Sequence, residues 1–389
     1  MQPILYPVIL AGGASSRLWP ASDARRPKWD MRLLGNYTLL QEAWRRARSV
    51  APASRGLVVA GKAHQDLIRS SLPDLPKGNL LIEPEGRDTA GAVAYAAGRI
   101  LRLDPQAVML VLPGDHVISP VPRFACCALA AAVVAQREAA LVTFGIVPRA
   151  PATAYGYIHR GEPLAPATPE PGEPRTFRVL AFKEKPDYAT AESYVAGGAH
   201  YWNGGIFAFP MAQLMEEFDT HLPRHASMAR ALATAKSHGA WQRTAKLHFA
   251  GLPRVSVDFG IMEKARRVAA IAADFNWDDI GSWTAVGDHL PMSDHNAVAP
   301  GTQLEAVESS GNVVMAPGRR VALVGVQGLA VVDDPAGLLI CSLKKDQLVK
   351  QVAQRMPPFK PPVQRRGKAV RVQIKMRSPG RNGKRTRGS

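Results

Sequence analysis

The sequence predicts an α/β protein with a doubly wound, mostly parallel sheet of Rossmann-like type, followed by a small β-rich domain. Three features support this fold class. Short apolar runs alternate with helical patterns over the first two-thirds of the chain. Loops rich in glycine and charged residues follow the apolar runs, as is typical of the carboxyl ends of parallel strands. After Trp283, short β-rich pieces separated by glycine turns replace the alternation.

Strands and helices are expected in strict alternation along residues 8–147. Thr38 and Gln41 have the spacing of a capping box, which predicts where the first helix begins. Asp88 or Thr89 is the expected cap of a later helix. Strands are predicted at 8–11, 56–61, 79–84, 107–118 and 139–147, and helices at 36–50, 64–72, 88–101 and 124–135. Three more strands at 155–160, 177–186 and 201–210 are expected to border a pocket, followed by a helical stretch over 211–246.

The composition divides the chain into three parts. Residues 1–290 are the expected main domain, residues 291–356 a small β-rich domain, and residues 357–389 a basic tail. The tail holds 11 Lys and Arg, no Asp or Glu and few large apolar residues, so we expect it to be disordered. The rest of the chain has 38 basic and 32 acidic residues, so most of the net charge of +17 comes from the tail. We leave open that the tail also contacts nucleic acid or an acidic membrane, as a secondary property of the protein.

Several classes of protein do not fit this composition. The longest apolar run, residues 124–135, is shorter than the about 20 residues that a membrane span needs. We find no charged and apolar leader that would act as a signal peptide. Cys126, Cys127 and Cys341 lack the spacing of metal ligands or redox pairs and are expected to be packed thiols. We therefore expect a cytoplasmic protein without a membrane segment.

The stretch "GGASSR" ends the first predicted strand in a way that suits an anion. Gly12 and Gly13 carry no Cβ, so backbone N–H groups can approach a phosphate closely. Arg17 adds a forked cation that suits phosphate oxygens, and Lys28 follows closely enough to return to the same place. The spacing matches neither the P-loop nor the dinucleotide fingerprint. A plain glycine turn with a surface arginine explains the motif equally well when it is taken alone.

Two acidic motifs, "LPGDH" and "WDDIGSW", lie far apart in the sequence. Asp115 follows a strongly apolar strand, where a carboxylate is costly unless it is solvated or bound to a cation. Asp115 and Asp279 together with substrate phosphates would suit Mg²⁺ or another divalent cation, because Mg²⁺ takes few protein ligands and keeps an oxygen shell. His116 is expected in the pocket wall, since Mg²⁺ prefers oxygen. The alternative is that both aspartates only cap a turn or a helix.

A third group of polar residues suits a sugar phosphate. Glu184 and Asn203, in "FKEKP" and "YWNGGIF", have the oxygen and amide groups that bind sugar hydroxyls. Lys185 suits a phosphate. An exposed charged turn before Pro186 is the alternative for the first of these motifs.

Together the motifs resemble those of a known enzyme family. The stretches "LAGGASSRLWP…RPK", "EPEGRDTA", "LPGDH", "YGYI", "FKEKP", "YWNGGIFAF", "SVDFGIMEK" and "WDDIGSW" occur in the order found in bacterial mannose-1-phosphate guanylyltransferases. The resemblance covers roughly residues 5–345. It implies a nucleotidyltransferase domain over 1–290 and a left-handed β-helix-like domain over 291–356.

The resemblance also implies an activity and a set of site residues. The enzymes transfer GMP from GTP to mannose 1-phosphate and release pyrophosphate with the help of a divalent cation, and a homodimer is expected. Arg17, Lys28, Asp115 and Asp279 would be catalytic, the two aspartates as ligands of Mg²⁺. The residues implied to bind the nucleotide are Gly12, Gly13, Arg17, Lys28, Arg87, Asp88 and Gly114. Those implied to bind the sugar phosphate are Gly156, Glu184, Lys185 and Asn203.

The chain departs from the family pattern at several positions. Ser15 replaces a glycine in the phosphate loop, Trp29 and Asp30 replace glutamine and phenylalanine, and Asp88 replaces asparagine. Gly91 stands in place of a proline, and Gly114 and Gly204 in place of serines. These departures leave two alternatives open. The substrate is another hexose 1-phosphate or nucleotide, or the protein is a catalytically weak regulatory homologue. The longer relatives carry a further isomerase domain, which we do not expect here.

Overall fold

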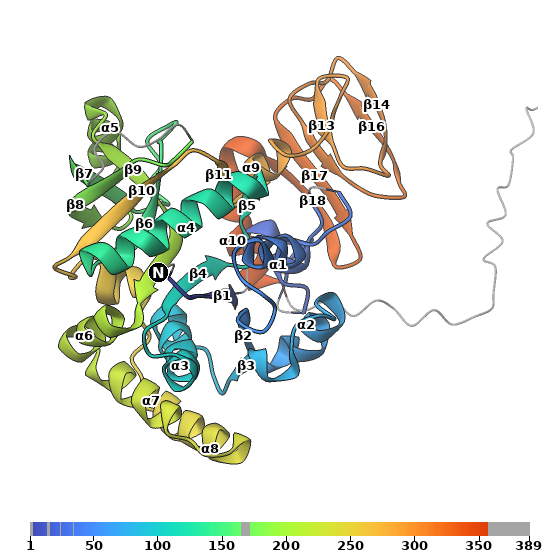
Figure 1. Cartoon of the computed structure of the whole chain (residues 1–389). Helices are drawn as coiled ribbons and strands as arrows, with labels where there is room; N and C mark the ends of the chain where they lie inside the picture. The colour runs from blue at the N-terminus through green and yellow to red at the C-terminus, as the bar shows by residue number, and fades with distance from the viewer. Residues whose placement is uncertain (1–2, 14–15, 24, 34, 165–171, 357–389) are drawn as a thin grey trace, which may run out of the picture.

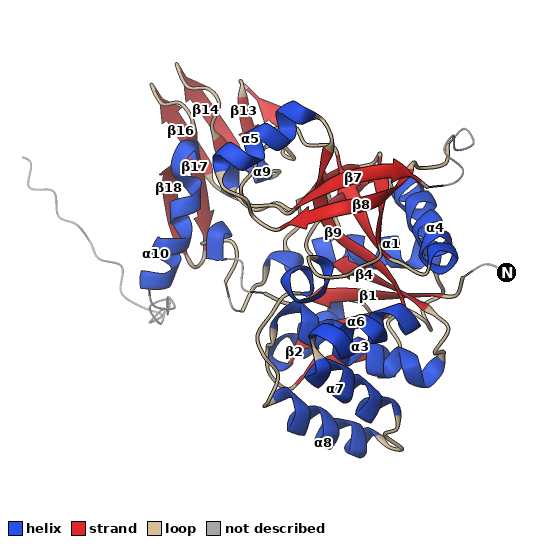
Figure 2. Ribbon diagram, turned by 90° about the vertical axis from the view of Figure 1, so that its left-hand side faces the viewer, coloured by secondary structure: helices blue, strands red, loops and turns tan. Residues whose placement is uncertain are grey.

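The computed structural model describes residues 3–13, 16–23, 25–33, 35–164 and 172–356. A nine-stranded sheet with helices on both faces forms the larger part of the molecule, and a small β-rich part stands at the end opposite helices α7 and α8 (Figures 1 and 2). The expectations for Ser15 and for the tail at 357–389 lie outside the described residues. Within the described part of the chain, no helix has the length and apolar character needed to cross a bilayer.

The central sheet is mixed, which corrects the prediction of a mostly parallel one. Strands β3, β2, β1 and β4 are parallel to one another as predicted, but β9 lies antiparallel between β4 and β6. Strand β8 is likewise antiparallel to β10 and β7. The alternation of the sequence could not reveal this insertion, because β9 follows β6, β7 and β8 in the chain and returns to lie beside β4. In order across the sheet the strands are β3 (Leu80–Glu83), β2 (Leu57–Gly61), β1 (Leu5–Ala11), β4 (Val108–Pro113), β9 (His200–Pro210), β6 (Leu141–Ile146), β10 (Val268–Ala273), β8 (Thr176–Lys183) and β7 (Tyr157–Pro163).

Both faces of the sheet are covered, because β1 alternates between two apolar cores. Leu5 and Ile9 pack with the residues of α1 (Leu39–Val50) and α4 (Val121–Glu138). Tyr6 and Val8 pack on the other face, against α3 (Asp88–Leu103), α6 (Met211–His221), α7 (Pro223–Ala233) and α8 (His238–Phe249). The two remaining helices of this part are α2 (Gln65–Ser71) and α5 (Tyr188–Gly197).

Several predicted elements differ in detail from those observed. The capping box of Thr38 and Gln41 is present, with both of its hydrogen bonds. Helix α3 begins at Asp88, but the predicted cap by Asp88 or Thr89 is wrong, because Arg87 holds the cap position and makes no side-chain cap. The predicted strand 107–118 is two strands, β4 and β5 (Val117–Ser119), and β5 pairs with β11 (Asn276–Asp278). The break turns residues 114–116 out of the sheet. Strand β10, which the structure contains, is not among the strands predicted from the sequence.

The β-rich part winds through successive turns of short strands, and strands of neighbouring turns pair in parallel. Ala297, Val313 and Ala330 lie in register on three successive turns. Buried Asn312 links these turns, because its amide donates to Asn296 at 2.8 Å and its oxygen accepts from the Leu329 N–H at 2.9 Å. Its strands are β12 (Met292–Ser293), β13 (Asn296–Val298), β14 (Gln303–Val307), β15 (Val313–Met315), β16 (Arg320–Val324), β17 (Leu329–Asp334) and β18 (Gly337–Ser342). This arrangement agrees with the expected β-helix-like domain.

The β-rich part supports the loop that follows β1. Buried Leu18 shares one apolar core with Trp283 of α9 (Trp283–Gly287) and with Val349 of α10 (Val349–Arg355). Arg26 makes a two-pronged ion pair with Asp334 at the end of β17, with N–O distances of 2.7 and 2.6 Å. Leu18, which follows Arg17, is therefore packed against side chains that come from residues 283–349.

A close approach of two helices gives a test of this fold. An added Cβ on Gly98 of α3 would lie 2.6 Å from Cβ of Leu232 and 3.0 Å from the carbonyl oxygen of Ala229, both on α7. We expect Gly98→Ala to lower the free energy of unfolding by about 1–2 kcal/mol, because overpacking outweighs the better helix propensity of alanine. Urea denaturation measures the change. Gly239→Ala is the control, since its Cβ meets only the tip of the Arg243 side chain, and an equal loss there would contradict the packing argument.

Candidate functional site

A small polar pocket of about 230 Å³ lies beside the carboxyl ends of β1 and β4. The structure brings together in it four side chains that the sequence analysis places in one site, although they come from distant segments. The residues that line the pocket are Arg17, Leu18, Lys28, Asp115, His116, Asp279, Ile280 and Gly281. Ligands of open α/β sheets bind at this edge, so the position agrees with the general rule for the fold.

Lys28 connects the two acidic segments of the pocket. Its Nζ donates to Oδ2 of Asp115 at 2.8 Å and to the carbonyl oxygen of Asp279. The lysine is only 5% exposed, so the ammonium group has little access to water. Burial alone would raise the pKa of the Asp115 carboxyl, but the charge of Lys28 and its hydrogen bond hold that pKa below its usual value. Asp115 is therefore ionised at neutral pH.

The two aspartates of "WDDIGSW" have different environments. Asp278 accepts the N–H of Ile280 at 2.7 Å and lies 3.0 Å from Nε2 of His289, so it stabilises the turn. Asp279 lines the pocket, and its Oδ1 accepts the hydroxyl of Tyr155 at 2.9 Å. Burial and the charge of Asp279 both raise the pKa of Tyr155, so this hydroxyl keeps its proton. A Cβ on Gly281 would lie 3.1 Å from Oδ1 of Asp279, so a larger residue here would shift the Asp279 carboxylate.

His116 forms part of the pocket wall, as expected. Nε1 of Trp277 donates to its Nδ1 at 3.2 Å, so Nδ1 is the acceptor nitrogen. Burial lowers the pKa of His116, against the opposing effect of Asp115, and the ring is neutral. Under the pocket, the buried Arg46 of α1 donates to the carbonyl oxygen of His116 at 3.1 Å. Burial lowers the pKa of Arg46 to about 10, so it stays charged at neutral pH.

The carboxylates of this pocket fit a hard divalent cation with few protein ligands. Among the described residues, no group of three or more His, Cys, Asp or Glu side chains could hold a metal ion. Asp115 and Asp279 are two oxygen donors from separate segments, and each uses one carboxylate oxygen in the bonds given above. Mg²⁺ binds in this manner, through one or two carboxylates, water and substrate phosphates, so the donor set fits it.

A second cluster contains the four residues predicted to bind a sugar phosphate. The side chain of Glu184 is 9% exposed and forms an ion pair with Lys185. A Cβ on Gly156 would collide with Oε2 of Glu184 and lie 3.3 Å from Cβ of Asn203, so the three residues are in close contact. Asn203 is buried at the middle of β9, and its backbone N–H donates to the Gly156 carbonyl at 2.8 Å.

Tyr155 joins the two clusters. Its hydroxyl reaches Asp279, and its carbonyl oxygen accepts the N–H of Lys185 at 3.2 Å. Its ring packs edge-on against Trp202 and Trp277, with centroid distances of 5.0 and 5.2 Å. The sequence alone predicts Tyr155 only as a core or wall residue, because an aromatic residue between two motifs carries no signal of its own.

Other predicted site residues do not line the polar pocket. Arg87 donates to Glu85 at 2.8 Å and to the Ala250 carbonyl at 3.1 Å, and Asp88 accepts the N–H of Thr89 at 2.7 Å. Gly114 lies against β1, where a Cβ would be 3.0 Å from the Leu10 carbonyl oxygen. Gly12 and Gly13 are exposed, and a Cβ on either would meet nothing within 4 Å. The backbone of Gly13 has a positive φ of 88°, which glycine adopts without strain.

The departure from the family pattern at Trp29 is explained by packing. Trp29 is 1% exposed in the core under β1, and its ring lies edge-on to His64 with a centroid distance of 5.4 Å. It faces away from solvent and is absent from the pocket lining. Its replacement of a polar residue therefore alters the core beside Lys28 rather than the lining of the pocket.

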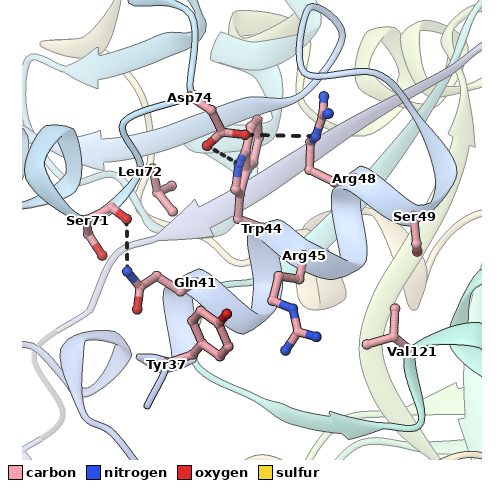
Figure 3. A pocket seen from close by; sticks show the side chains of 10 residues that line it. All are labelled: Tyr37, Gln41, Trp44, Arg45, Arg48, Ser49, Ser71, Leu72, Asp74 and Val121. Carbon is pink, nitrogen blue, oxygen red and sulfur yellow. Dashed lines mark hydrogen bonds and ion pairs between the residues drawn. The ribbon is translucent and has the colours of Figure 1, made fainter.

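A larger hollow of about 550 Å³ lies elsewhere, beside α1 (Figure 3). Its lining includes none of the predicted site residues. Its polar groups bond to one another: Trp44 donates to Asp74 at 2.8 Å, and Arg48 lies 3.9 Å from the same carboxylate. Its second cation, Arg45, pairs with Glu42 at 2.9 Å. We therefore place the candidate site in the smaller pocket, where the predicted residues come together with their charges.

Comparison with known proteins identifies the family. The nucleotidyl transferase family matches residues 6–291, and the MannoseP isomerase/GMP-like beta-helix domain family matches residues 304–356. A mannose-1-phosphate guanylyltransferase of Klebsiella pneumoniae is 35% identical over 355 residues, which cover 90% of this chain and 74% of the relative. The xanthan biosynthesis protein XanB of Xanthomonas campestris pv. campestris is 34% identical over 356 residues, covering 90% of this chain and 73% of XanB.

A solved structure agrees with this result. The crystal structure of a protein from Thermus thermophilus, named mannose-1-phosphate geranyltransferase, has a TM-score of 0.77 and 33% sequence identity. The similarity covers 90% of this chain and 98% of that one. The resemblance inferred from the sequence motifs is thus confirmed over both folded parts. The chain belongs to the nucleotidyl transferase family and, within it, to the mannose-1-phosphate guanylyltransferases.

Proposed function

We propose that the protein transfers GMP from GTP to mannose 1-phosphate, giving GDP-mannose and pyrophosphate. The observation that carries the proposal is the convergence of Arg17, Lys28, Asp115 and Asp279 on one small polar pocket, joined through Tyr155 to the cluster around Glu184 and Asn203. The first group offers charges for a triphosphate, and the second offers carboxylate and amide groups for hydroxyls. The names of the similar proteins supply the identities of the base and the sugar.

The proposed reaction is an in-line displacement at phosphorus. A phosphate oxygen of mannose 1-phosphate donates an electron pair to the α-phosphorus of GTP, and the bond from that phosphorus to the oxygen bridging the β-phosphate breaks. Pyrophosphate leaves with the bonding pair, so the substrates supply both nucleophile and leaving group. The protein therefore needs no covalent intermediate, and catalysis rests on positioning and charge neutralisation.

The predicted residues take separate roles in this proposal, and Gly156 leaves room for Glu184 and Asn203. Arg17 neutralises the departing pyrophosphate, and Lys28 faces the α-phosphate while its ion pair keeps Asp115 ionised. Asp115 and Asp279 would hold Mg²⁺, which when bound draws charge from the phosphate oxygens. Glu184 and Asn203 bind sugar hydroxyls, and Lys185 binds the sugar phosphate. For the nucleotide, backbone of Gly12, Gly13 and Gly114 would hold the triphosphate, with Arg87 and Asp88 near the guanine or ribose. We also propose that the protein acts as a cytoplasmic homodimer.

A substrate panel tests the proposed function. Pyrophosphate release is measured with GTP, UTP and dTTP, each paired with mannose 1-phosphate and glucose 1-phosphate. We expect the highest kcat/KM with GTP and mannose 1-phosphate. Best turnover with UTP or dTTP and glucose 1-phosphate would contradict the assignment of base and sugar. Binding of GTP without turnover of any pair would instead indicate a regulatory homologue.

Removing the charge of Asp115 tests its role at the reacting phosphates. We expect Asp115→Asn to lower kcat by about 10²–10³-fold or more, because a preorganised charge at the reacting group is lost and Lys28 loses its partner. Turnover is measured at increasing Mg²⁺ concentration. Asp219→Asn, which removes an exposed carboxylate bound to Arg230 on the surface, should leave kcat unchanged. Near wild-type turnover of Asp115→Asn would reject the metal role.

A further inference from the structure

The motif "SVDFGIMEK" has no role in the reaction described so far, yet the structure places it beside the sugar-phosphate cluster. Residues Asp258–Met262 form a single π-helical turn, a rare conformation that is often found at functional sites. Its apolar residues anchor it: Gly260, Ile261 and Met262 are buried, and a Cβ on Gly260 would lie 2.9 Å from Leu222. The two acidic residues at its ends, Asp258 and Glu263, point away from that anchor and contact the cluster.

Asp258 fixes the orientation of the Asn203 amide. Nδ2 of Asn203 donates to Oδ1 of Asp258 at 2.8 Å. Oδ1 of Asn203 accepts the hydroxyl of buried Thr143 at 2.8 Å and the N–H of Gly205 at 3.3 Å. Because the Asp258 carboxylate only accepts and the Gly205 N–H only donates, a flip of the amide would lose both of these bonds. One N–H of Nδ2 is left over for a ligand.

Glu263 fixes the neighbouring segment through the backbone. Its Oε1 accepts the N–H of Glu184 at 2.9 Å. The next residue, Lys185, has a φ of 48°, which a residue with a side chain adopts only when its surroundings hold it there. The two ends of one π-helical turn therefore hold the Asn203 side chain and the Glu184 backbone, of the two residues that are proposed to bind the sugar.

The charges of the cluster favour a ligand that donates hydrogen bonds. Burial, and then the nearby Glu184 carboxylate, raise the pKa of Asp258 to about 6. Lys185 is the cation that acts on both carboxylates, and its side chain is 56% exposed. Two carboxylates that share this half-exposed cation leave excess negative charge, which hydroxyl donors of a sugar would stabilise.

We propose that Asp258 and Glu263 are positioning residues of the hexose 1-phosphate subsite, Asp258 through the Asn203 amide and Glu263 through the Glu184 backbone. This inference rests on the proposed function, because it assumes that Glu184 and Asn203 meet a sugar phosphate. It adds to that function a π-helical turn whose two acidic ends set the geometry of sugar binding and leave the triphosphate pocket unaffected.

Steady-state kinetics and calorimetry with mannose 1-phosphate test the inference in the full-length protein. We expect Asp258→Ala to raise the KM and the Kd for mannose 1-phosphate about tenfold or more, because one buried hydrogen bond is lost and the Asn203 amide is left unpaired. The KM for GTP should stay within about twofold of wild type, because neither Asp258 nor its partner Asn203 lines the polar pocket. Asp258→Asn keeps an oxygen that accepts from Nδ2 of Asn203, so it should show a smaller rise. Glu263→Gln, which keeps the acceptor for the Glu184 N–H, should likewise be milder than Glu263→Ala.

Asp219→Asn is the matched control, a carboxylate removed from an exposed position on α6. Equal increases of KM for both substrates, together with a lower melting temperature, would show a purely structural role and overturn the inference. An unchanged KM and Kd for mannose 1-phosphate in Asp258→Ala would overturn it as well. If Asp258→Ala does not fold, the same two outcomes are read from Glu263→Ala, which removes the acceptor of the Glu184 N–H.

The calorimetric measurement separates this inference from the proposed function. Wild-type protein that binds mannose 1-phosphate but transfers no GMP contradicts the proposed function, and the variants still test the subsite through Kd. Wild-type protein that binds no hexose 1-phosphate, with mannose 1-phosphate and glucose 1-phosphate as the probes, contradicts the subsite and the inference together.

Discussion

The buried ammonium group of Lys28 holds the candidate site together. It bonds to Asp115 at 2.8 Å and to the Asp279 backbone, two segments that would otherwise bring like charges to one small pocket. A charge with little access to water is costly unless it is paired, so this contact fixes the positions of both segments. Three features place the chain around this ammonium group: the break between β4 and β5, the turn around Ile280 and the core packing of Trp29.

From Lys28 the site extends in two directions. Tyr155 links it to the second cluster through its hydroxyl and its backbone, and the π-helical turn at Asp258 bonds to Asn203 of that cluster. In the other direction, the core around Leu18 and the Arg26–Asp334 pair join the loop that follows β1 to the β-rich part. The β-rich part thus supports a loop of the candidate site without lining the pocket.

The motifs predicted the members of the site better than the path of the chain. Arg17, Lys28, Asp115 and Asp279 are expected together on the rule that loops at the carboxyl ends of parallel strands converge, and the structure agrees. The same rule predicts a mostly parallel sheet, which is wrong for β9, because a strand buried on both faces has the same apolar pattern in either direction. The roles of Arg87, Asp88 and Gly114 stay predictions, and the effect of Ser15 lies outside the described residues.

By itself, the sequence determined the fold class, the family and the residue types that can handle phosphate, because these depend on local patterns and on motifs a few residues long. The tertiary structure shows why Asp279 and not the adjacent Asp278 faces the pocket, since Asp278 is bonded to the Ile280 N–H and His289. Only the tertiary structure decided that Tyr155, Asp258 and Glu263 contact the candidate site. Their partners, Asp279, Asn203 and the Glu184 backbone, are distant in the sequence, and no local pattern encodes a hydrogen bond across that distance.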